Sequence, residues 1–176
     1  MSRKLHIGGT QPSPGWEILN AVPSPWVDHL GDARDLSPFP DNTFSEVYAS
    51  HVLEHMDYIR ELTDALTEWR RVLQPGGRLY ISVPDLDVLA RLFLDRENLT
   101  VDDRFQVMRM MFGAHVDKYD YHVAGLNQEF LTGFLSHTGY TNMRRVERFG
   151  LFQDTSTMVF KGVAISINII AEKPLT

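Results

Sequence analysis

The sequence contains no cysteine, which excludes disulfide bonds, thiolate metal sites and cysteine nucleophiles and is typical of a reducing compartment. It also lacks any apolar run near the roughly 18 residues that a membrane-spanning helix needs, and the residues after Met1 soon become polar, unlike a secretory signal. Positive charge is scarce, because 17 Lys and Arg face 23 Asp and Glu. We therefore expect a cytoplasmic protein with no membrane and no nucleic-acid partner.

The length of 176 residues is that of one domain, 1–176, and no internal repeat or linker marks a second one. Arg144, Arg145 and Arg148 form a small basic cluster in this acidic chain, which we interpret as a solvated strand edge. The sequence is compatible with a homodimer formed through an outer face, although no exposed apolar stripe marks that face.

Hydrophobic periodicity indicates an α/β protein, because residues 39–84 have the order strand, loop, helix, turn and buried strand. The patterns predict strands at 4–7, 16–19, 44–50, 79–83, 143–148 and 164–172, and helices at 58–73, 86–94, 102–112 and 127–138. Ile59 is expected to face the core from the first of these helices and Phe130 from the last. The loop between the first two strands is too short for a three-turn helix. The stretch 113–125 has little periodicity and is expected to form a loop that could close over a site.

Ligands of such folds bind where parallel strands end, so the residues after Ala49 and Val83 are the first candidates for a site. A nicotinamide-dependent dehydrogenase would carry G-x-G-x-x-G at the start of a first helix and an acidic residue about 20 positions later. The sequence has neither, which argues against that class.

Three runs resemble the class I S-adenosylmethionine-dependent methyltransferases: GDARDLSPFPDNTFSEVYASHVLEHM at 31–56, LQPGGRLYISVP at 73–84 and HTGYTNMRRV at 137–146. The chain is most similar to a short group of predicted methyltransferases in which a tight loop joins the first two strands. The resemblance implies a three-layer, Rossmann-like fold with a mostly parallel seven-stranded sheet and an antiparallel last strand. It also implies that S-adenosylmethionine lies over the carboxyl ends of the first strands.

The resemblance assigns cofactor contacts to seven residues of the first third of the chain: Ile7, Gly8, Gly9, Asn20, Asp32, Ala33 and Ser50. Asp32 matches the carboxylate that receives the adenine amino group. The chain departs from the family pattern at Thr10, where a further glycine is usual, and at Asn20 or Ala21, where an acidic residue usually binds the ribose hydroxyls. Glu17 could supply that carboxylate only in a different strand register. Losing the charged contact would weaken cofactor binding by roughly 1.5–3 kcal/mol.

The segment His51-Val52-Leu53-Glu54-His55 also fits the H-x-x-E-H pattern of zinc enzymes, whose two histidines project from one helix. It directly follows a predicted strand, so no long helix is available, and we expect no metal. In similar methyltransferases these residues form the turn beside the sulfonium. His51 is the first candidate for a catalytic base, followed by His55 and by Asp85, which could instead cap the next helix.

Residues His115, Tyr121 and His122 lie in the predicted loop, where this family commonly recognises its acceptor, and they are our substrate-binding candidates. The sequence thus predicts methyl transfer to a small-molecule or sugar-like acceptor. The alternative is a protein that keeps the fold for binding or scaffolding after losing strong cofactor binding.

Overall fold

A computed structural model describes residues 2–176. Its main sheet has seven strands in the order β3-β2-β1-β4-β5-β9-β6, and a two-stranded hairpin, β7-β8, lies outside it. The strands are β1 (Arg3–Ile7), β2 (Trp16–Asn20), β3 (His29–Leu30), β4 (Phe44–Ser50), β5 (Leu73–Pro84), β6 (Thr141–Val146), β7 (Val159–Phe160), β8 (Val163–Ala164) and β9 (Ser166–Glu172). The helices are α1 (Glu61–Val72), α2 (Leu86–Leu94), α3 (Val101–Phe112) and α4 (Gln128–His137), with short 3-10 turns η1 (Leu53–His55) and η2 (Thr155–Thr157).

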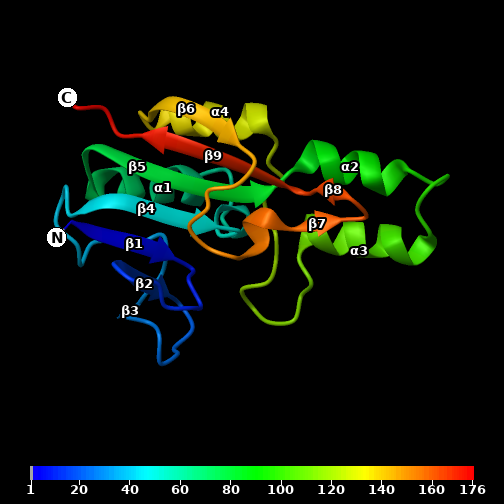
Figure 1. Cartoon of the computed structure of the whole chain (residues 1–176), viewed down its shortest axis with the longest axis horizontal. Helices are drawn as coiled ribbons and strands as arrows, with labels where there is room; N and C mark the ends of the chain where they lie inside the picture. The colour runs from blue at the N-terminus through cyan, green and yellow to red at the C-terminus, as the bar shows by residue number, and fades with distance from the viewer. Residues whose placement is uncertain (1) are drawn as a thin grey trace.

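Strands β1 to β5 all run in the same direction, and β9 runs antiparallel to both of its neighbours, β5 and β6. The predicted mostly parallel sheet with an antiparallel last strand is therefore confirmed. The register pairs Ile7 with Leu19 and with Ala49. Because of this alignment, the loops that follow β1, β2 and β4 leave the sheet at one edge, which Figure 1 shows at the tips of the arrows.

Helices α1 and α4 cover one face of the sheet (Figure 1). The spacing of Leu62, Leu66 and Trp69 gives α1 an apolar stripe, and all three side chains are fully buried. The two helices are also joined to each other, because the Tyr140 hydroxyl that follows α4 donates to the carbonyl of Leu66 at 3.2 Å. Burying a side chain of this size stabilises the folded state by about 1.5–3 kcal/mol. The layer between these two helices and the sheet holds most of the buried apolar residues and is the main core.

The opposite face is covered by the irregular segment 147–158, which crosses in front of the sheet in Figure 1. Phe152 packs on His6 and on Tyr48, with ring centroids 4.1 and 4.6 Å apart, and Phe149 packs on Tyr80. The predicted short connection between β1 and β2 explains this arrangement, because residues 8–15 are too few for a helix that could cover the face. The third layer is therefore extended chain and aromatic side chains.

The structure corrects three details of the sequence prediction. Helix α1 begins at Glu61, and Ile59, which was predicted to face the core, is 75% exposed. Phe130 was also predicted to point inward from α4 but is half exposed. The predicted last strand is divided, because Ala164 belongs to the β7-β8 hairpin and β9 begins only at Ser166. Within residues 2–176, no helix combines the length and the apolar character needed to cross a membrane.

Candidate active site at the carboxyl edge of the sheet

The two glycines after β1 are required by the packing of the chain itself. Gly8 has a positive φ of 77°, and a Cβ at this position would lie 2.8 Å from Val52. A Cβ at Gly9 would lie 2.8 Å from the His6 ring. The Gly8 amide also donates to the carbonyl of Leu19 at 2.8 Å, which holds the loop against β2. Together these constraints bring bare backbone to the sheet edge directly after Ile7.

Asn20 stands at the end of β2, where the family usually has a carboxylate. Its side-chain amide donates to the Gly9 carbonyl at 3.0 Å, and its side-chain oxygen accepts from the Val22 amide at 2.9 Å. Asn20 therefore ties the two loops together, which a carboxylate could not do because it has no N–H. Glu17 is not available as a substitute, since its carboxylate binds Arg3 at 2.7 and 2.8 Å and His29 at 2.8 Å.

Asp32 lies in the loop after β3 and is half exposed. Both of its oxygens accept from the Arg34 side chain, at 2.6–3.1 Å, and one also accepts from the Arg34 backbone amide. The side-chain hydrogen bonds from Arg34 hold the pKa of Asp32 below its usual value. Arg34 also binds Glu61 at the start of α1. The next residue, Ala33, is fixed because its carbonyl accepts from the buried Trp69 indole at 2.7 Å.

Strand β4 ends at Ser50, and His51 follows it in a turn with a φ of 54°. The backbone amide of His51 donates to the Ser82 carbonyl at 2.9 Å, which fixes the turn to β5. Its Nε2 lies 2.9 Å from the Ser166 hydroxyl, and its Nδ1 lies 3.2 Å from Oε1 of Glu54. The Ser50 hydroxyl is buried and has no hydrogen-bond partner within the described chain.

Glu54 is a central residue that the sequence analysis did not select. It lies in the short turn η1, is 1% exposed, and faces His51, His55 and His122. Burial raises the pKa of Glu54, but the three histidines outweigh burial and keep it below its usual value. Desolvation lowers the pKa of His122, which is partly opposed by the nearby Glu54. The only signal in the sequence was the H-x-x-E-H spacing.

The loop 113–125 delivers only one of its three candidate residues to this cluster. His122 is largely buried, and its ring packs edge-on against His55 with centroids 4.9 Å apart. His115 and Tyr121 are exposed and stack on each other at 4.0 Å. The loop is anchored at Glu54, whose carbonyl accepts from the backbone amides of Val123 and Ala124.

Asp85 is buried, but its carboxylate is already engaged. One oxygen accepts from the Asp87 and Val88 amides at 3.2 and 3.3 Å and caps α2, while the other accepts from Arg145 at 3.1 Å. This is the capping arrangement that the sequence analysis left open as the alternative to acid–base chemistry. Asp85 lines neither the cavity beside His51 nor the cavity under segment 147–158, both described below.

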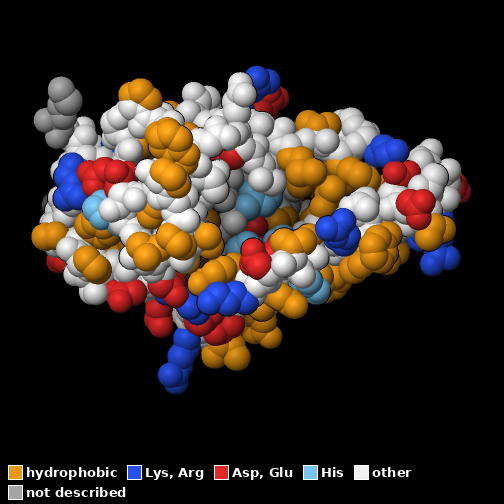
Figure 2. Space-filling model, turned by 90° about the horizontal axis from the view of Figure 1, so that it is seen from below, with side chains coloured by type: hydrophobic (Ala, Val, Ile, Leu, Met, Phe, Trp, Pro, Cys, Tyr) orange, Lys and Arg blue, Asp and Glu red, His pale blue; other side chains and the backbone are white. Residues whose placement is uncertain are grey.

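A cavity of about 360 Å³ lies beside the histidine cluster, beyond the ends of β4 and β5. Figure 2, which views the molecule from below relative to Figure 1, shows histidine side chains on the floor of a hollow in the middle of the face that it draws. The cavity is lined by His51, His55, Pro84, Gln106, Arg109, Met110, Gly113, Ala114, Asp120, His122, Thr155, Met158 and Ile165. Its volume and its mixture of apolar and polar walls are typical of small-molecule sites.

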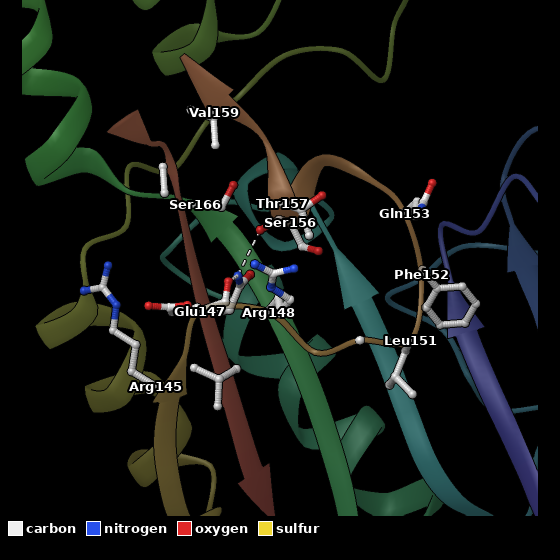
Figure 3. A pocket seen from close by; sticks show the side chains of 14 residues that line it. Arg145, Glu147, Arg148, Leu151, Phe152, Gln153, Ser156, Thr157, Val159 and Ser166 are labelled. Atoms are coloured by element: carbon white, nitrogen blue, oxygen red, sulfur yellow. Dashed lines mark hydrogen bonds between the residues drawn. The ribbon is translucent and has the colours of Figure 1, made fainter. Parts of the chain in front are cut away.

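A second, wider cavity of about 1100 Å³ lies on the face covered by segment 147–158. Figure 3 shows that its lining comes from β6, β9 and the chain that follows β6, including Arg145, Arg148 and Ser166. None of the three histidines around Glu54 lines it, and neither cavity is lined by Gly8, Asn20 or Asp32. The smaller cavity is therefore the better candidate for a site of chemistry.

Comparison with known proteins identifies a methyltransferase relationship. Residues 19–81, from β2 to β5, match the model of a family described as a methyltransferase domain. The ubiquinone/menaquinone biosynthesis C-methyltransferase UbiE of Ruegeria sp. (strain TM1040) is 34% identical over 127 residues, which are 68% of this chain and 46% of that protein. The chain spans less than half the length of the curated relatives that it matches.

Solved structures confirm the fold over nearly the whole chain. A methyltransferase from Archaeoglobus fulgidus, named as S-adenosylmethionine-dependent, has a TM-score of 0.61 at 16% identity, covering 98% of this chain and 86% of that one. A 1,6-didemethyltoxoflavin-N1-methyltransferase from Burkholderia thailandensis, solved with its substrate and S-adenosylhomocysteine, has a TM-score of 0.58 at 14% identity, covering 98% and 72%. The chain belongs to the class I S-adenosylmethionine-dependent methyltransferases.

Proposed function

We propose that this protein transfers a methyl group from S-adenosylmethionine to a small-molecule acceptor bound in the 360 Å³ cavity. The observation that carries the proposal is the position of His51. It follows β4, the neighbour of β1 and its glycine loop, and it also lines the cavity. The cofactor edge predicted from the family and the candidate acceptor cavity therefore meet at one residue.

The cofactor would be held by backbone at Gly8 and Gly9 and by the loops that carry Asn20, Asp32 and Ala33. The positive φ of Gly8 fits this assignment, because it leaves the edge without a side chain. Asn20 retains one acceptor lone pair on its side-chain oxygen, although its N–H group is engaged with Gly9. When bound, S-adenosylmethionine supplies an activated methyl group on a sulfonium, so the chain must mainly align the acceptor.

In this proposal His51 acts as the base where the acceptor still carries a proton. The proton would be received at Nδ1, because Nε2 is bound to the Ser166 hydroxyl, and the Glu54 carboxylate 3.2 Å from Nδ1 would stabilise the charged ring. His55 and His122 complete the wall of the cavity behind it. Ser50 would lie under the cofactor, while His115 and Tyr121 would act from the outer side of the loop.

The walls of the cavity favour a polar or anionic acceptor. Arg109 and Gln106 from α3 line it and bind each other at 3.2 Å, so both are oriented toward the same region. A guanidinium can bind a carboxylate or phosphate oxygen in two-point geometry. Sugar-like acceptors remain within this class. The cytoplasmic location, the single domain over 1–176 and the homodimer stay predictions.

A second candidate function, binding or scaffolding without catalysis, is favoured by the contacts of Asp32 and Asn20. Asp32 is saturated by Arg34, and Asn20 bridges its own loops, so the two side chains expected to anchor the nucleoside serve the fold first. In that case the edge would bind the cofactor weakly or not at all.

Methyl transfer can be tested with tritiated S-adenosylmethionine and a panel of small carboxylate, phosphate and hydroxyl acceptors. We expect label on at least one acceptor class, and we expect Arg109→Gln to raise KM for it because a charged contact is lost. Lys118→Ala, at an exposed position outside the lining of the cavity, is the matched control. No label with any acceptor, while a known methyltransferase labels its own, would favour the non-catalytic alternative.

A further inference from the structure

Two histidines of the cluster have fixed tautomers. Nδ1 of His55 lies 3.1 Å from the Tyr121 carbonyl, and Nδ1 of His122 lies 3.1 Å from the Met110 carbonyl. A carbonyl oxygen can only accept, so each Nδ1 must carry the proton and donate it. Each ring is then left with an unprotonated Nε2, and Nε2 of His122 points toward Glu54 at 4.0 Å from Oε1.

The third histidine, His51, reaches the same state through a serine. The Ser166 hydroxyl donates its single proton to the Thr155 carbonyl at 3.0 Å, so toward His51 it can only accept. Nε2 of His51, at 2.9 Å, therefore carries the ring proton in the neutral form. Nδ1 is left with a lone pair, and this lone pair faces Oε1 of Glu54 at 3.2 Å.

Glu54 lies among these lone pairs without a hydrogen-bond donor. It is 1% exposed, and neither carboxylate oxygen has a hydrogen-bond partner within residues 2–176. A buried carboxylate with no compensating charge is strongly unfavourable, and it faces nitrogen lone pairs as long as the three rings are neutral. The arrangement is favourable only if a positive charge lies beside the carboxylate, either a proton on Nδ1 of His51 or a bound cation.

The positions of the atoms suit a metal ion. One ligand atom each from Glu54, His55 and His122 lies within 4.8 Å of the others. Bonds of about 2.0–2.2 Å in tetrahedral geometry place ligand atoms about 3.4 Å apart, so small side-chain shifts would close the site. Metal-binding histidines characteristically donate their other N–H to a backbone carbonyl, which is what Tyr121 and Met110 accept here.

We propose that Glu54, His55 and His122 bind one divalent transition-metal cation of the Zn²⁺ type. Two imidazoles and one carboxylate suit such an ion, whereas Ca²⁺ and Mg²⁺ prefer oxygen ligands alone. Three protein ligands leave a fourth position, and both histidine ligands line the 360 Å³ cavity, so that position is available to water or an acceptor oxygen.

This inference replaces the expectation from the sequence that there is no metal. That expectation rested on the absence of a long helix at H-x-x-E-H, and the structure has only the 3-10 turn Leu53–His55 there. The site is completed by His122, which the loop after α3 brings back to the turn. The pairing of His122 with Glu54 has no local sequence signal.

The test measures binding of Zn²⁺ by the full chain after treatment with EDTA, using calorimetry and metal analysis, with Co²⁺ absorption spectra to report the ligand set. We expect one equivalent per chain. Glu54→Gln and His122→Ala should each weaken binding at least about 10-fold. His137→Ala, an exposed histidine at the end of α4, is the matched control and should bind like the parent.

Thermal unfolding keeps the test interpretable if a variant is unstable. The parent chain should melt at a higher temperature with Zn²⁺ than with EDTA, whereas Glu54→Gln should melt at the same temperature in both. Less than one equivalent in the parent, or parent-like affinity in Glu54→Gln, would overturn the proposal. In that case the negative charge of Glu54 would be balanced by a proton that it shares with His51. Metal binding is measured without cofactor or acceptor, so this result is independent of methyl transfer.

Discussion

At the scale of single residues, Gly8 carries two separate constraints, a positive φ and a close approach to Val52. We expect Gly8→Ala to lower the free energy of unfolding by about 1–2 kcal/mol from the φ alone, plus the cost of the contact. Gly15→Ala is the matched control, because Gly15 has a φ of 80° and open space around it. Urea unfolding measures both variants. Equal losses would mean that the contact with Val52 is relieved at no cost.

The pair formed by Asp32 and Arg34 makes a second prediction at this scale. If Asp32 binds the adenine amino group, Arg34 competes for the same oxygens. Arg34→Gln should then strengthen S-adenosylmethionine binding, by no more than about fivefold because an exposed ion pair is weak. Calorimetric titration measures the change. Weaker binding in this variant would show that Arg34 helps to hold the cofactor.

Residue types at the site could be predicted, but several partners could not. The run 31–56 suggested Asp32 and His51 as site residues, and the structure places them after β3 and β4. Asn20 was read as a weakened ribose contact, yet its donor binds Gly9, a pairing that depends on the register of β1 and β2. Glu54 was visible only as one letter of a motif, because its burial among three histidines is a property of the assembled fold.

At the scale of elements, Asp85 at the start of α2 could serve either the structure or proton transfer. Its carboxylate caps the helix and pairs with Arg145, so we predict a structural role. Asp85→Asn preserves a good cap and should leave turnover within a few fold, whereas Asp85→Ala should lower the free energy of unfolding by about 1 kcal/mol or more. Stability and turnover are measured on the same preparations. A loss of about 100-fold in kcat for Asp85→Asn would instead identify proton transfer.

Strong periodicity predicted the elements better than their ends. The apolar stripe of α1 is confirmed from Leu62 onward. Before it, Asp57 accepts from the amides of Ile59 and Arg60, so a turn occupies the positions expected to be the first helical turn. The β7-β8 hairpin was not predicted, because each strand has only two residues and shows no alternation. The loop 113–125 was recognised as irregular, but its anchor at Glu54 lies far away in the sequence.

At the scale of the whole molecule, stability should depend on pH through His6. This histidine lies on the face covered by segment 147–158, and burial lowers its pKa to about 4, opposed only partly by Asp154. The unfolded chain therefore binds a proton that the folded chain excludes between pH 6.5 and 4. Stability should be unaffected by His6 above this window and should fall by about 3 kcal/mol as the pH falls through it.

Urea unfolding of the parent chain and of His6→Gln at pH 7.5 and 5 tests this prediction. The parent should lose more stability than the variant, since glutamine does not titrate. Restricting the comparison to pH 5 and above limits protonation of ion-paired carboxylates such as Glu17, whose pKa is lowered to about 2 by Arg3 and His29. Equal losses in the two proteins would show that the His6 ring is accessible to protons in the folded state.

The family was accessible from motifs within single strands and loops, and the resemblance in turn implied the mostly parallel sheet with its antiparallel last strand. The order of the strands was not predicted. The separation of the site into a nucleoside part and an acceptor part could not be predicted from the sequence. Nucleoside contacts are expected at β1 to β3, whereas the histidine cluster and the cavity lie beyond β4 and β5, under α3 and its following loop. The proposed cofactor region thus lies at the edge that is typical of the family, and the proposed acceptor region lies beside it.

The most direct test of the central claim is calorimetric titration of the chain with S-adenosylmethionine and S-adenosylhomocysteine. Our account predicts binding in the micromolar range that is weakened at least tenfold in Asp32→Ala, with a thermal stabilisation of about 2.7 kcal/mol at 100 times the dissociation constant. Absence of binding at millimolar ligand would contradict the account. It would mean that Asn20 and the Arg34 pair have removed the cofactor site, and the binding or scaffolding function would take its place.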